Sequence, residues 1–305
     1  MPRSAERERA LVAAMPGVFV LIWSTGFVVA RYGMPHAPPL GFLTLRYALS
    51  MLAFAVWILL ARAAWPRGAA QWGHLGVAGA LMHAGYLGGV WMAVKAGIGA
   101  GTVALVVGLQ PVLTAVWLSA SGHAQAVGQR QWLGLALGLC GLMLVVGQRL
   151  GGGEVTPTNL ALAVCALLAI TAGTLYQKRF VAACDVRTAN AVQLAAAFVI
   201  TAPLAWLEDG AWQLHAELVG AMAWSVLVLT LGGSSLLYLL LQRGAATRVA
   251  SLMYLVPPCT ALLAWLLFGE PLTWPVLVGL AVTAVGVALV VANRFAGRPE
   301  AAPAA

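Results

Sequence analysis

The side chains of this chain that could do chemistry are polar groups embedded in long apolar segments. His83 and Tyr86 stand three positions apart in one such segment, so a helix would place them on one face. Further hydroxyl, amide and aromatic candidates in such segments are Trp23, Ser24, Thr25, Gln110, Thr171, Thr174, Ser234, Tyr238 and Tyr254. Together they predict a cavity with hydrogen-bonding groups and aromatic faces, suited to a small zwitterion or heterocycle. Each hydroxyl taken alone also fits a hydrogen bond between packed helices.

Ionisable and aromatic residues at the centres and ends of these segments are candidates for more specific roles. His83 lies near a segment centre, which predicts either a proton relay or a neutral hydrogen bond between helices. Arg46 lies inside the second segment, where it could bind a substrate carboxylate or extend to the outer interface. Glu270 is expected to be a structural cap or a gate residue at the outer surface. Trp91 and Trp224, near segment ends, are expected in the interfacial aromatic belt.

Prolines interrupt two apolar segments at matching places. The stretch "LVVGLQPVLTAVWL" contains Pro111, and "SLMYLVPPCTALLA" contains Pro257 and Pro258. Proline removes a backbone donor, and carbonyls freed at membrane depth are tolerated only against protein or a water-filled cavity. Broken helices at corresponding places of two halves indicate a transport site. We therefore expect both segments to line a central cavity, with a packing kink as the alternative.

Several chemistries are excluded because their residues are missing. Every Asp and Glu lies in a loop or at a segment end, so no buried carboxylate is available to neutralise a cationic substrate. The sequence has no HExxH, GxSxG or Walker A motif, which argues against a membrane-embedded hydrolase and against transport driven by ATP. None of the four cysteines forms a CxxC pair, so neither a zinc site nor a disulfide framework is expected. No enzyme activity, metal or cofactor is therefore predicted.

The elements that must position these residues are membrane-spanning helices. Of the 305 residues, 62% are hydrophobic and 9% are charged, which leaves too little polar surface to cover a water-soluble fold. A helix needs about 20 mostly apolar residues to cross a bilayer. Segments of that kind lie at 13–32, 40–61, 72–95, 101–120, 130–148, 158–178, 188–206, 217–241, 248–268 and 273–293. The sequence thus predicts an all-α integral membrane protein with ten transmembrane helices.

Basic residues set the predicted orientation. With the N-terminus inside, thirteen of the seventeen Lys and Arg residues lie in cytoplasmic segments and three lie on the opposite side. This bias predicts that both termini are cytoplasmic. The formal net charge of +8 is scattered between apolar segments rather than clustered, so no nucleic-acid partner is expected. The first segment lacks a clean cleavage site and is expected to remain as a helix.

The chain carries an internal repeat. The two proline-containing stretches quoted above match at an offset of 146 positions, and Gly141 matches Gly286 at an offset of 145. The halves 1–150 and 151–305 hold five predicted spans each. An odd number turns the second half upside down relative to the first, which gives two inverted-topology five-helix repeats. Such repeats favour alternating access, although some channels contain them too.

These features together resemble one transporter family. The motifs "WSTGFVVARYG" and "LRYALS" in the first two spans, the matched "LQP" and "LVP", "FGEPLT" and "WLGLALGLCGLMLVV" are similar to the EamA family of the drug/metabolite transporter superfamily. The resemblance implies a bacterial inner-membrane carrier, often an exporter of amino acids or related metabolites, with a cavity between the halves. The stretch "SASGHAQAVGQ" departs from the Gly-Glu that members often carry after the fourth span, and Glu270 alone retains the acid.

The sequence predicts a secondary carrier that exports small metabolites, such as amino acids or related compounds, by uniport or exchange. Two alternatives remain: a flippase-like carrier of lipid or lipid-linked substrates, and a proton-coupled drug or metabolite antiporter that uses His83. The expected partners are the small-molecule substrate and the lipid bilayer. The chain is expected to be a monomer or a homodimer, with the glycine-rich fifth and tenth spans as a structural or dimer-forming edge.

Overall fold

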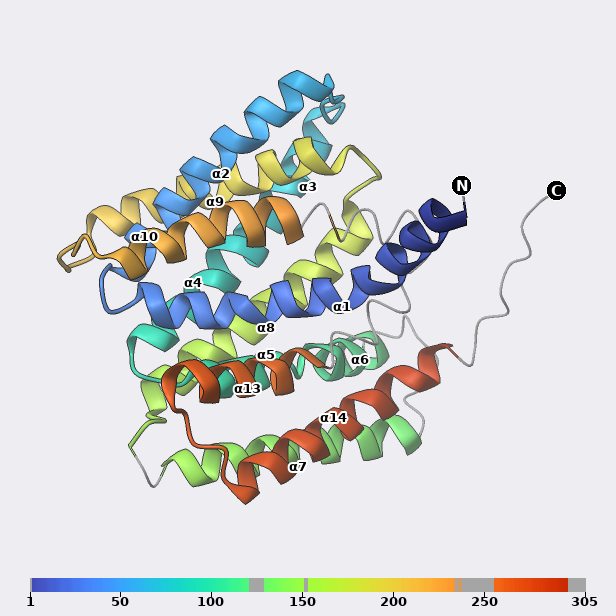
Figure 1. Ribbon diagram of the computed structural model, residues 1–305, viewed down its shortest axis with the longest axis vertical. Coiled ribbons are helices and arrows are strands. Elements are labelled where there is room, and N and C mark those ends of the chain that lie inside the picture. Colours follow the sequence, from blue (N-terminus) through green and yellow to red (C-terminus); the bar gives the residue numbers. More distant parts are fainter. Residues whose placement is uncertain (1, 121–128, 151–152, 234–235, 237–254, 296–305) are drawn as a thin grey trace.

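The structure of the protein is a computed structural model that describes residues 2–120, 129–150, 153–233, 236 and 255–295. Within these residues, all regular secondary structure is helical (Figure 1). The helices are α1 (Pro2–Gly33), α2 (Pro39–Ala61), α3 (Ala69–Gly79), η1 (Ala80–Gly85), α4 (Tyr86–Lys95), α5 (Ala100–Val107), α6 (Gln110–Ala120), α7 (Gln129–Leu150), α8 (Pro157–Phe180), α9 (Val186–Trp206), α10 (Ala216–Ala223), η2 (Trp224–Gly233), α13 (Val256–Phe268) and α14 (Trp274–Phe295). The all-α prediction is therefore confirmed for the described residues.

The apolar helices are those of a membrane protein. By length and composition, the helical stretches that could cross a membrane are Pro39–Ala61, Ala69–Lys95, Pro157–Phe180, Val186–Trp206 and Ala216–Gly233. Shorter apolar stretches lie at Gly17–Gly33, Ala100–Thr114, Trp132–Gly147, Val256–Phe268 and Trp274–Leu289. Each of the ten predicted ranges overlaps one of these stretches. Length and composition support five crossings directly, so the count of ten remains a prediction.

Helices from the two halves of the chain interleave in stacked layers (Figure 1). At one end of the molecule α2 and α3 pack against α9, and at the opposite end α7 packs against α14. Between these ends, α4 packs against α8 and α5 packs against α13, with α1 in contact with both α4 and α13. Each main pairing joins one helix from each half, so both halves share the core. Large buried side chains of this core include Phe42, Tyr47, Phe54 and Trp91.

Glycines let α7 and α14 pack closely. A Cβ atom at Gly141 would lie 2.5 Å from the backbone oxygen of Gly279, and one at Gly286 would lie 2.5 Å from that of Gly134. Gly279 and Gly286 are the second-half counterparts of Gly134 and Gly141, so the two contacts are equivalent under the repeat. Small residues at such an interface allow the two backbones to approach each other.

The three prolines that were predicted to break helices, Pro111, Pro257 and Pro258, stand at helix starts. α6 begins one residue before Pro111, and α13 begins one residue before Pro257 and Pro258. The backbone N–H groups of a first turn have no acceptor within the helix. Proline, which lacks an N–H, is therefore tolerated there. The start of α13 packs against the end of α5, because a Cβ atom at Gly108 would lie 2.7 Å from the ring of Pro257.

Two helical segments widen to π-helix, which no sequence pattern predicted. η1 continues α3, and η2 continues α10. An offset of 146 carries residues 80–85 of η1 onto 226–231 of η2, so the two segments occupy equivalent places in the repeat. π-Helical turns are rare and occur frequently at functional sites. Both segments border the cavity that Arg46 enters.

Candidate functional site

A cavity of about 120 Å³ lies between α1, α2, α4, α8 and the two π-helical segments. Its polar and aromatic lining includes Trp23, Arg46, His83, Tyr86, Trp91 and Thr230. Ligand pockets usually measure about 300–1,000 Å³, so the described conformation holds a narrow cavity. A groove of about 280 Å³ between α13 and α14 is larger, but its lining is wholly apolar.

Arg46 is the charged group of this cavity, and η2 and α4 hold its side chain. Nη2 donates a hydrogen bond of 3.2 Å to Thr230 Oγ1, and Nε donates one of 3.4 Å to the same oxygen. The guanidinium carbon lies 5.5 Å from the centroid of the Trp91 ring, within the range of a cation–π contact. Arg46 is only 7% exposed, so its side chain faces the cavity rather than the membrane interface. Its buried Nη1 atom has no hydrogen-bond partner among the described residues.

No acidic residue from the described part of the chain lines the cavity, so Arg46 has no counter-ion there. A buried charge is costly unless it is paired and hydrogen-bonded. A carboxylate bound at Nη1 would supply both the missing acceptor and the opposite charge, and arginine forms strong charge-assisted hydrogen bonds with such groups. The arrangement can therefore bind the anionic group of a ligand between apolar and aromatic walls.

His83 lies in η1 and lines the same cavity. Its backbone oxygen accepts a hydrogen bond of 2.9 Å from Tyr47 Oη, and the two rings meet edge-on with centroids 6.1 Å apart. His83 therefore lines the cavity, and its backbone oxygen is bonded to Tyr47 of α2.

Other predicted residues make contacts away from the cavity. Ser24, Thr25 and Thr171 each donate a hydrogen bond to a carbonyl of their own helix. Gln110 Nε2 donates to Thr174 Oγ1 at 2.9 Å, which joins α6 to α8. Such contacts are typical of hydroxyl and amide groups in packed membrane helices.

The three prolines do not line this cavity either. Pro257 and Pro258, with Gly108, border a separate space of about 10 Å³ next to α14. The described residues of α5, α6 and α13 contribute nothing to the Arg46 cavity, so the expectation that both proline-containing spans line it is not met there. The predicted residues Ser234, Tyr238 and Tyr254 lie outside the described residues.

Glu270 is a helix cap. Its Oε1 atom accepts a hydrogen bond of 2.9 Å from the backbone nitrogen of Ala100, at the start of α5. Glu154 Oε1 accepts one of 2.9 Å from the backbone nitrogen of Gly99 beside it. Carboxylates are favoured at a helix N-terminus because the unsatisfied amides and the helix dipole attract negative charge. Glu270 thus ties α5 of the first half to the end of α13 in the second.

Two residues that hold Arg46 were not among the predicted site residues. Thr230 stands four positions before Ser234, so helical spacing from that candidate would have reached it. The prediction that Trp91 belongs to the interfacial belt is wrong, because Trp91 is 2% exposed and lies beside Arg46. Position near a span end does not distinguish a buried tryptophan from an interfacial one.

Comparisons with known proteins agree on the class of protein. The profile of the EamA-like transporter family matches residues 14–147 and 158–292. The "Probable amino-acid metabolite efflux pump" of Salmonella typhimurium (strain LT2) is 26% identical over 270 residues, which cover 85% of this chain and 88% of that protein. The protein of the same name from Escherichia coli (strain K12) is 25% identical over 264 residues, 83% of this chain and 86% of its own. The "Uncharacterized transporter YvbV" of Bacillus subtilis (strain 168) is 26% identical over 286 residues, 91% and 90% of the two chains.

A solved crystal structure of a protein shares the fold. It is similar over 90% of this chain and 95% of its own, with a TM-score of 0.64 and 17% sequence identity. The family profile matches once in each half of the chain and together covers most of its length. The resemblance seen in the span motifs is thereby confirmed. The chain belongs to the EamA-like transporter family and is a multi-pass membrane protein.

Proposed function

We propose that this protein is a secondary carrier of small metabolites that contain a carboxylate, with amino acids and related compounds as the substrate class. The observation that carries the proposal is Arg46, a buried guanidinium whose Nη1 atom is unbonded among the described residues. A substrate carboxylate is the group that would complete this site. The Salmonella and E. coli relatives are named as amino-acid metabolite efflux pumps, which supports the same substrate class and export as the direction.

The substrate binds with its carboxylate at Nη1 of Arg46 and its side group against Trp23 and Tyr86. Aromatic faces attract cations, so an ammonium group can be held without an acidic residue. Thr230 and Trp91 orient the guanidinium before the substrate arrives, which lowers the ordering cost of binding. The narrow cavity limits the bound molecule to a small one unless the walls move apart.

Transport takes place by alternating access between two inverted five-helix repeats, as uniport or exchange. The equivalent glycine contacts between α7 and α14 support the repeat, because each contact is the other's counterpart. The π-helical segments η1 and η2 support it too, since both lie at equivalent places and both line the cavity. The walls that bind the substrate would then come from both halves.

Hydrogen bonds between loops support the ten-span orientation. Gln213 donates through its backbone nitrogen to the backbone oxygen of His36 at 2.8 Å, and both loops are predicted outside. Gln71 Nε2, in the first turn of α3, donates to the backbone oxygen of Ala182 at 2.8 Å, and both residues are predicted inside. α1 begins and α14 ends at the same side of the molecule (Figure 1). This arrangement supports ten crossings with both termini on one side of the membrane, and the charge bias predicts that this side is the cytoplasm.

A proton-coupled carrier is a second candidate, because His83 lines the cavity that Arg46 enters. An imidazole changes its charge near neutral pH, so a histidine at a substrate site can carry a proton in exchange for substrate. Stimulation of transport by a pH gradient, lost in His83→Gln, would favour this candidate. Transport that is indifferent to the gradient in both proteins would favour uniport or exchange.

The test of the proposal is counterflow of radiolabelled amino acids in proteoliposomes, with wild type compared with Arg46→Gln, Arg46→Lys and Arg67→Gln. Arg67 is an exposed arginine between α2 and α3 and serves as the matched control. Truncating one partner of a buried charged pair costs about 2–5 kcal/mol, so we expect the KM of Arg46→Gln to rise by more than about 30-fold. Arg46→Lys should retain part of the affinity, and Arg67→Gln should transport as wild type does. An unchanged KM in Arg46→Gln would refute the carboxylate site.

A further inference from the structure

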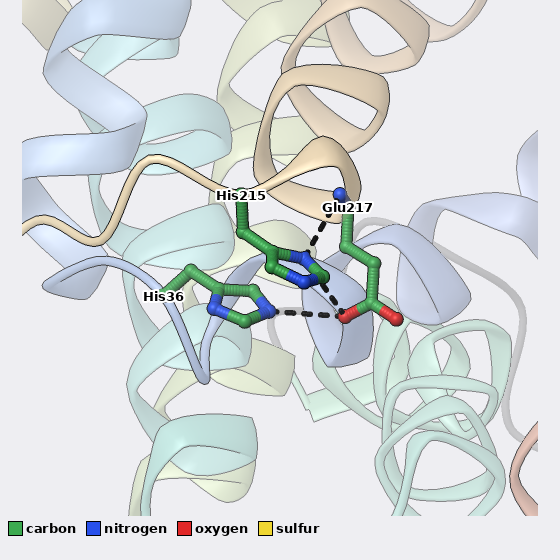
Figure 2. Close-up of side chains that lie close together, drawn as sticks. All are labelled: His36, His215 and Glu217. Carbon is green, nitrogen blue, oxygen red and sulfur yellow. Dashed lines mark hydrogen bonds and ion pairs between the residues drawn. The ribbon is translucent and has the colours of Figure 1, made fainter.

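Three metal-ligating side chains meet where the loop between α1 and α2 touches the start of α10 (Figure 2). His36 Nε2 lies 3.0 Å from Glu217 Oε2, and His215 Nδ1 lies 3.8 Å from the same oxygen. The ligand atoms of all three lie within 4.8 Å of one another, and none of the three residues lines the Arg46 cavity. Two imidazoles and one carboxylate are a ligand set that zinc binds, with a water in the fourth position.

The separations are close to those that one ion would impose. Zinc bonds of about 2.0–2.2 Å to imidazole nitrogen and carboxylate oxygen place the ligand atoms of a tetrahedral site about 3.3–3.5 Å apart. The two imidazole rings stack with centroids 4.4 Å apart and planes 14° apart, so one ring must turn before both nitrogens face one ion. The side chains of His215 and Glu217 are 54% and 46% exposed, so they can turn without disturbing the core, and a turn of His215 releases the hydrogen bond of 3.3 Å that its Nδ1 accepts from the Glu217 backbone nitrogen.

The cluster also lies at a contact between the two halves of the chain. A similar contact lies on the predicted cytoplasmic side of the molecule. There Gln71 Nε2 donates to the Ala182 oxygen at 2.8 Å, and Gln71 Oε1 accepts from the Ala182 nitrogen at 3.0 Å. Glu217 stands 146 positions after Gln71, and Ala182 stands 146 positions after His36. The contact between His36 and Glu217 is therefore the repeat-related counterpart of the contact between Gln71 and Ala182. An amide and a backbone group, unlike imidazole and carboxylate, are not the ligands that zinc prefers.

We infer that His36, His215 and Glu217 form a binding site for a divalent transition-metal ion such as zinc. A bound ion ties the loop between α1 and α2 to the start of α10 and holds this end of the carrier closed. An ion bound on the predicted outer side of the membrane therefore inhibits transport. The binding site stands by itself, whereas the inhibition rests on the proposed alternating access.

The first test is zinc titration of the purified full chain, freed of any affinity tag, in competition with a chromophoric chelator. We expect one zinc site per chain in wild type and at least about tenfold weaker binding in His36→Ala, His215→Ala and Glu217→Gln. His74→Gln is the matched control, because His74 bonds Tyr176 instead, with Nδ1 2.9 Å from the hydroxyl. Equal binding by wild type and the three site variants, or no binding at all, would overturn the site.

The second test measures counterflow with and without zinc. We expect zinc to slow transport by wild type and by His74→Gln but not by His215→Ala. Zinc binding that leaves wild-type transport unchanged would overturn the proposed inhibition of transport by the bound ion. Absence of all counterflow would count against the proposed carrier function, whereas the chelator titration would still decide the metal site.

Discussion

Neighbours from other helices surround the Arg46 guanidinium inside the apolar bundle. The hydroxyl of Thr230 accepts two of its hydrogen bonds, and the face of Trp91 lies 5.5 Å away. Thr230 in turn donates 2.8 Å to the backbone oxygen of Ser225, five positions earlier, a spacing that the π-helical turn of η2 provides. The π-helix thus orients a hydroxyl that binds the guanidinium. This series of contacts makes Thr230 a positioning residue for the proposed substrate site.

Thr230→Val keeps the shape of the side chain and removes the hydroxyl. Hydrogen bonds to charged groups contribute about 1.5–3 kcal/mol, so we expect the KM for substrate to rise about tenfold or more as Arg46 loses its orientation. Thr171→Val is the control, because among the described residues the Thr171 hydroxyl bonds its own helix at Leu167. Counterflow kinetics of the two variants measure the effect. Equal KM values would remove Thr230 from the site.

Asp185 offers a pH-dependent test outside the membrane spans. Hydrogen bonds from the Arg187 side chain, helped by the Arg187 backbone nitrogen, lower the pKa of Asp185 from its usual value. A lowered carboxyl pKa stabilises the folded state above the unfolded pKa, and this stabilisation disappears as the pH falls through the folded pKa. Because the pair is partly exposed, we expect Asp185→Asn to lose at most about 1 kcal/mol at pH 7.

The measurement for Asp185 is thermal unfolding in detergent at several pH values. The Tm difference between wild type and Asp185→Asn should be present at neutral pH and should shrink below about pH 4, where the usual Asp carboxyl protonates. A difference that grows on acidification would contradict the pKa direction.

At the scale of elements, close packing of α7 and α14 depends on backbone contact rather than on side chains. Gly141 lies against Thr283 and the backbone oxygen of Gly279, and Gly286 lies against the backbone of Gly134 and Gly138. In lipid, apolar side chains gain little by leaving the bilayer, so van der Waals contact between backbones becomes the main attraction. Glycine is needed in this interface because any Cβ would separate the helices.

Gly141→Ala tests this packing with a matched control in the same helix. The new Cβ would meet Thr283 Oγ1 and lie 2.5 Å from the Gly279 oxygen, whereas a Cβ at Gly147 would meet nothing within 4 Å. Overpacking of this kind costs about 1–3 kcal/mol, so we expect a clear loss of Tm in Gly141→Ala. Gly147→Ala should be neutral or slightly stabilising, since alanine favours helix. Equal Tm values for the two variants would contradict the interface.

At the scale of the whole molecule, contacts between the halves are formed at both ends. His36 meets Glu217 and Gln213 at one end, and Gln71 meets Ala182 at the other. Alternating access requires that the two sets of contacts break in turn. Because the two contacts are equivalent under the repeat, we expect the carrier to open at one of them in each of its two conformations.

Cross-linking either contact should stop transport. The pairs His36→Cys with Glu217→Cys and Gln71→Cys with Ala182→Cys would be made in a chain whose own four cysteines are replaced by serine. We expect a short cleavable bismaleimide to abolish counterflow in each pair, and cleavage of the reagent to restore it. The single-cysteine variants treated with the same reagent are the controls. Full transport by a cross-linked pair would exclude opening at that contact.

Orientation in the membrane has a direct test. Asp209 and Arg67 are exposed in loops that the charge bias places outside and inside, respectively. In the same cysteine-free chain, a membrane-impermeant maleimide should label Asp209→Cys in intact cells and Arg67→Cys only after permeabilisation. The reverse pattern would invert the proposed orientation.

The sequence by itself determined the class of protein, the helical segments and the family. These properties follow from local composition, because a span needs only enough consecutive apolar residues and a loop needs only its charges. Local sequence patterns also identified Arg46, His83, Tyr86 and Trp23 as candidate site residues, since a polar or aromatic residue inside an apolar segment is conspicuous wherever it lies. It could not tell these four from Ser24, Thr25 or Thr171, whose hydroxyls bond their own helices.

Only the tertiary structure decided which of these residues meet. Arg46 and Thr230 stand 184 positions apart, and His36 and Glu217 stand 181 apart, so no spacing rule connects them. Their contacts depend on how helices of one half pack against helices of the other, and on two π-helical turns that rotate η1 and η2 relative to a regular helix. A pattern of period 3.6 describes one helix face and carries no information about the partner that the face meets. The site is therefore a property of the packed bundle, whereas the bundle's helices are properties of the sequence.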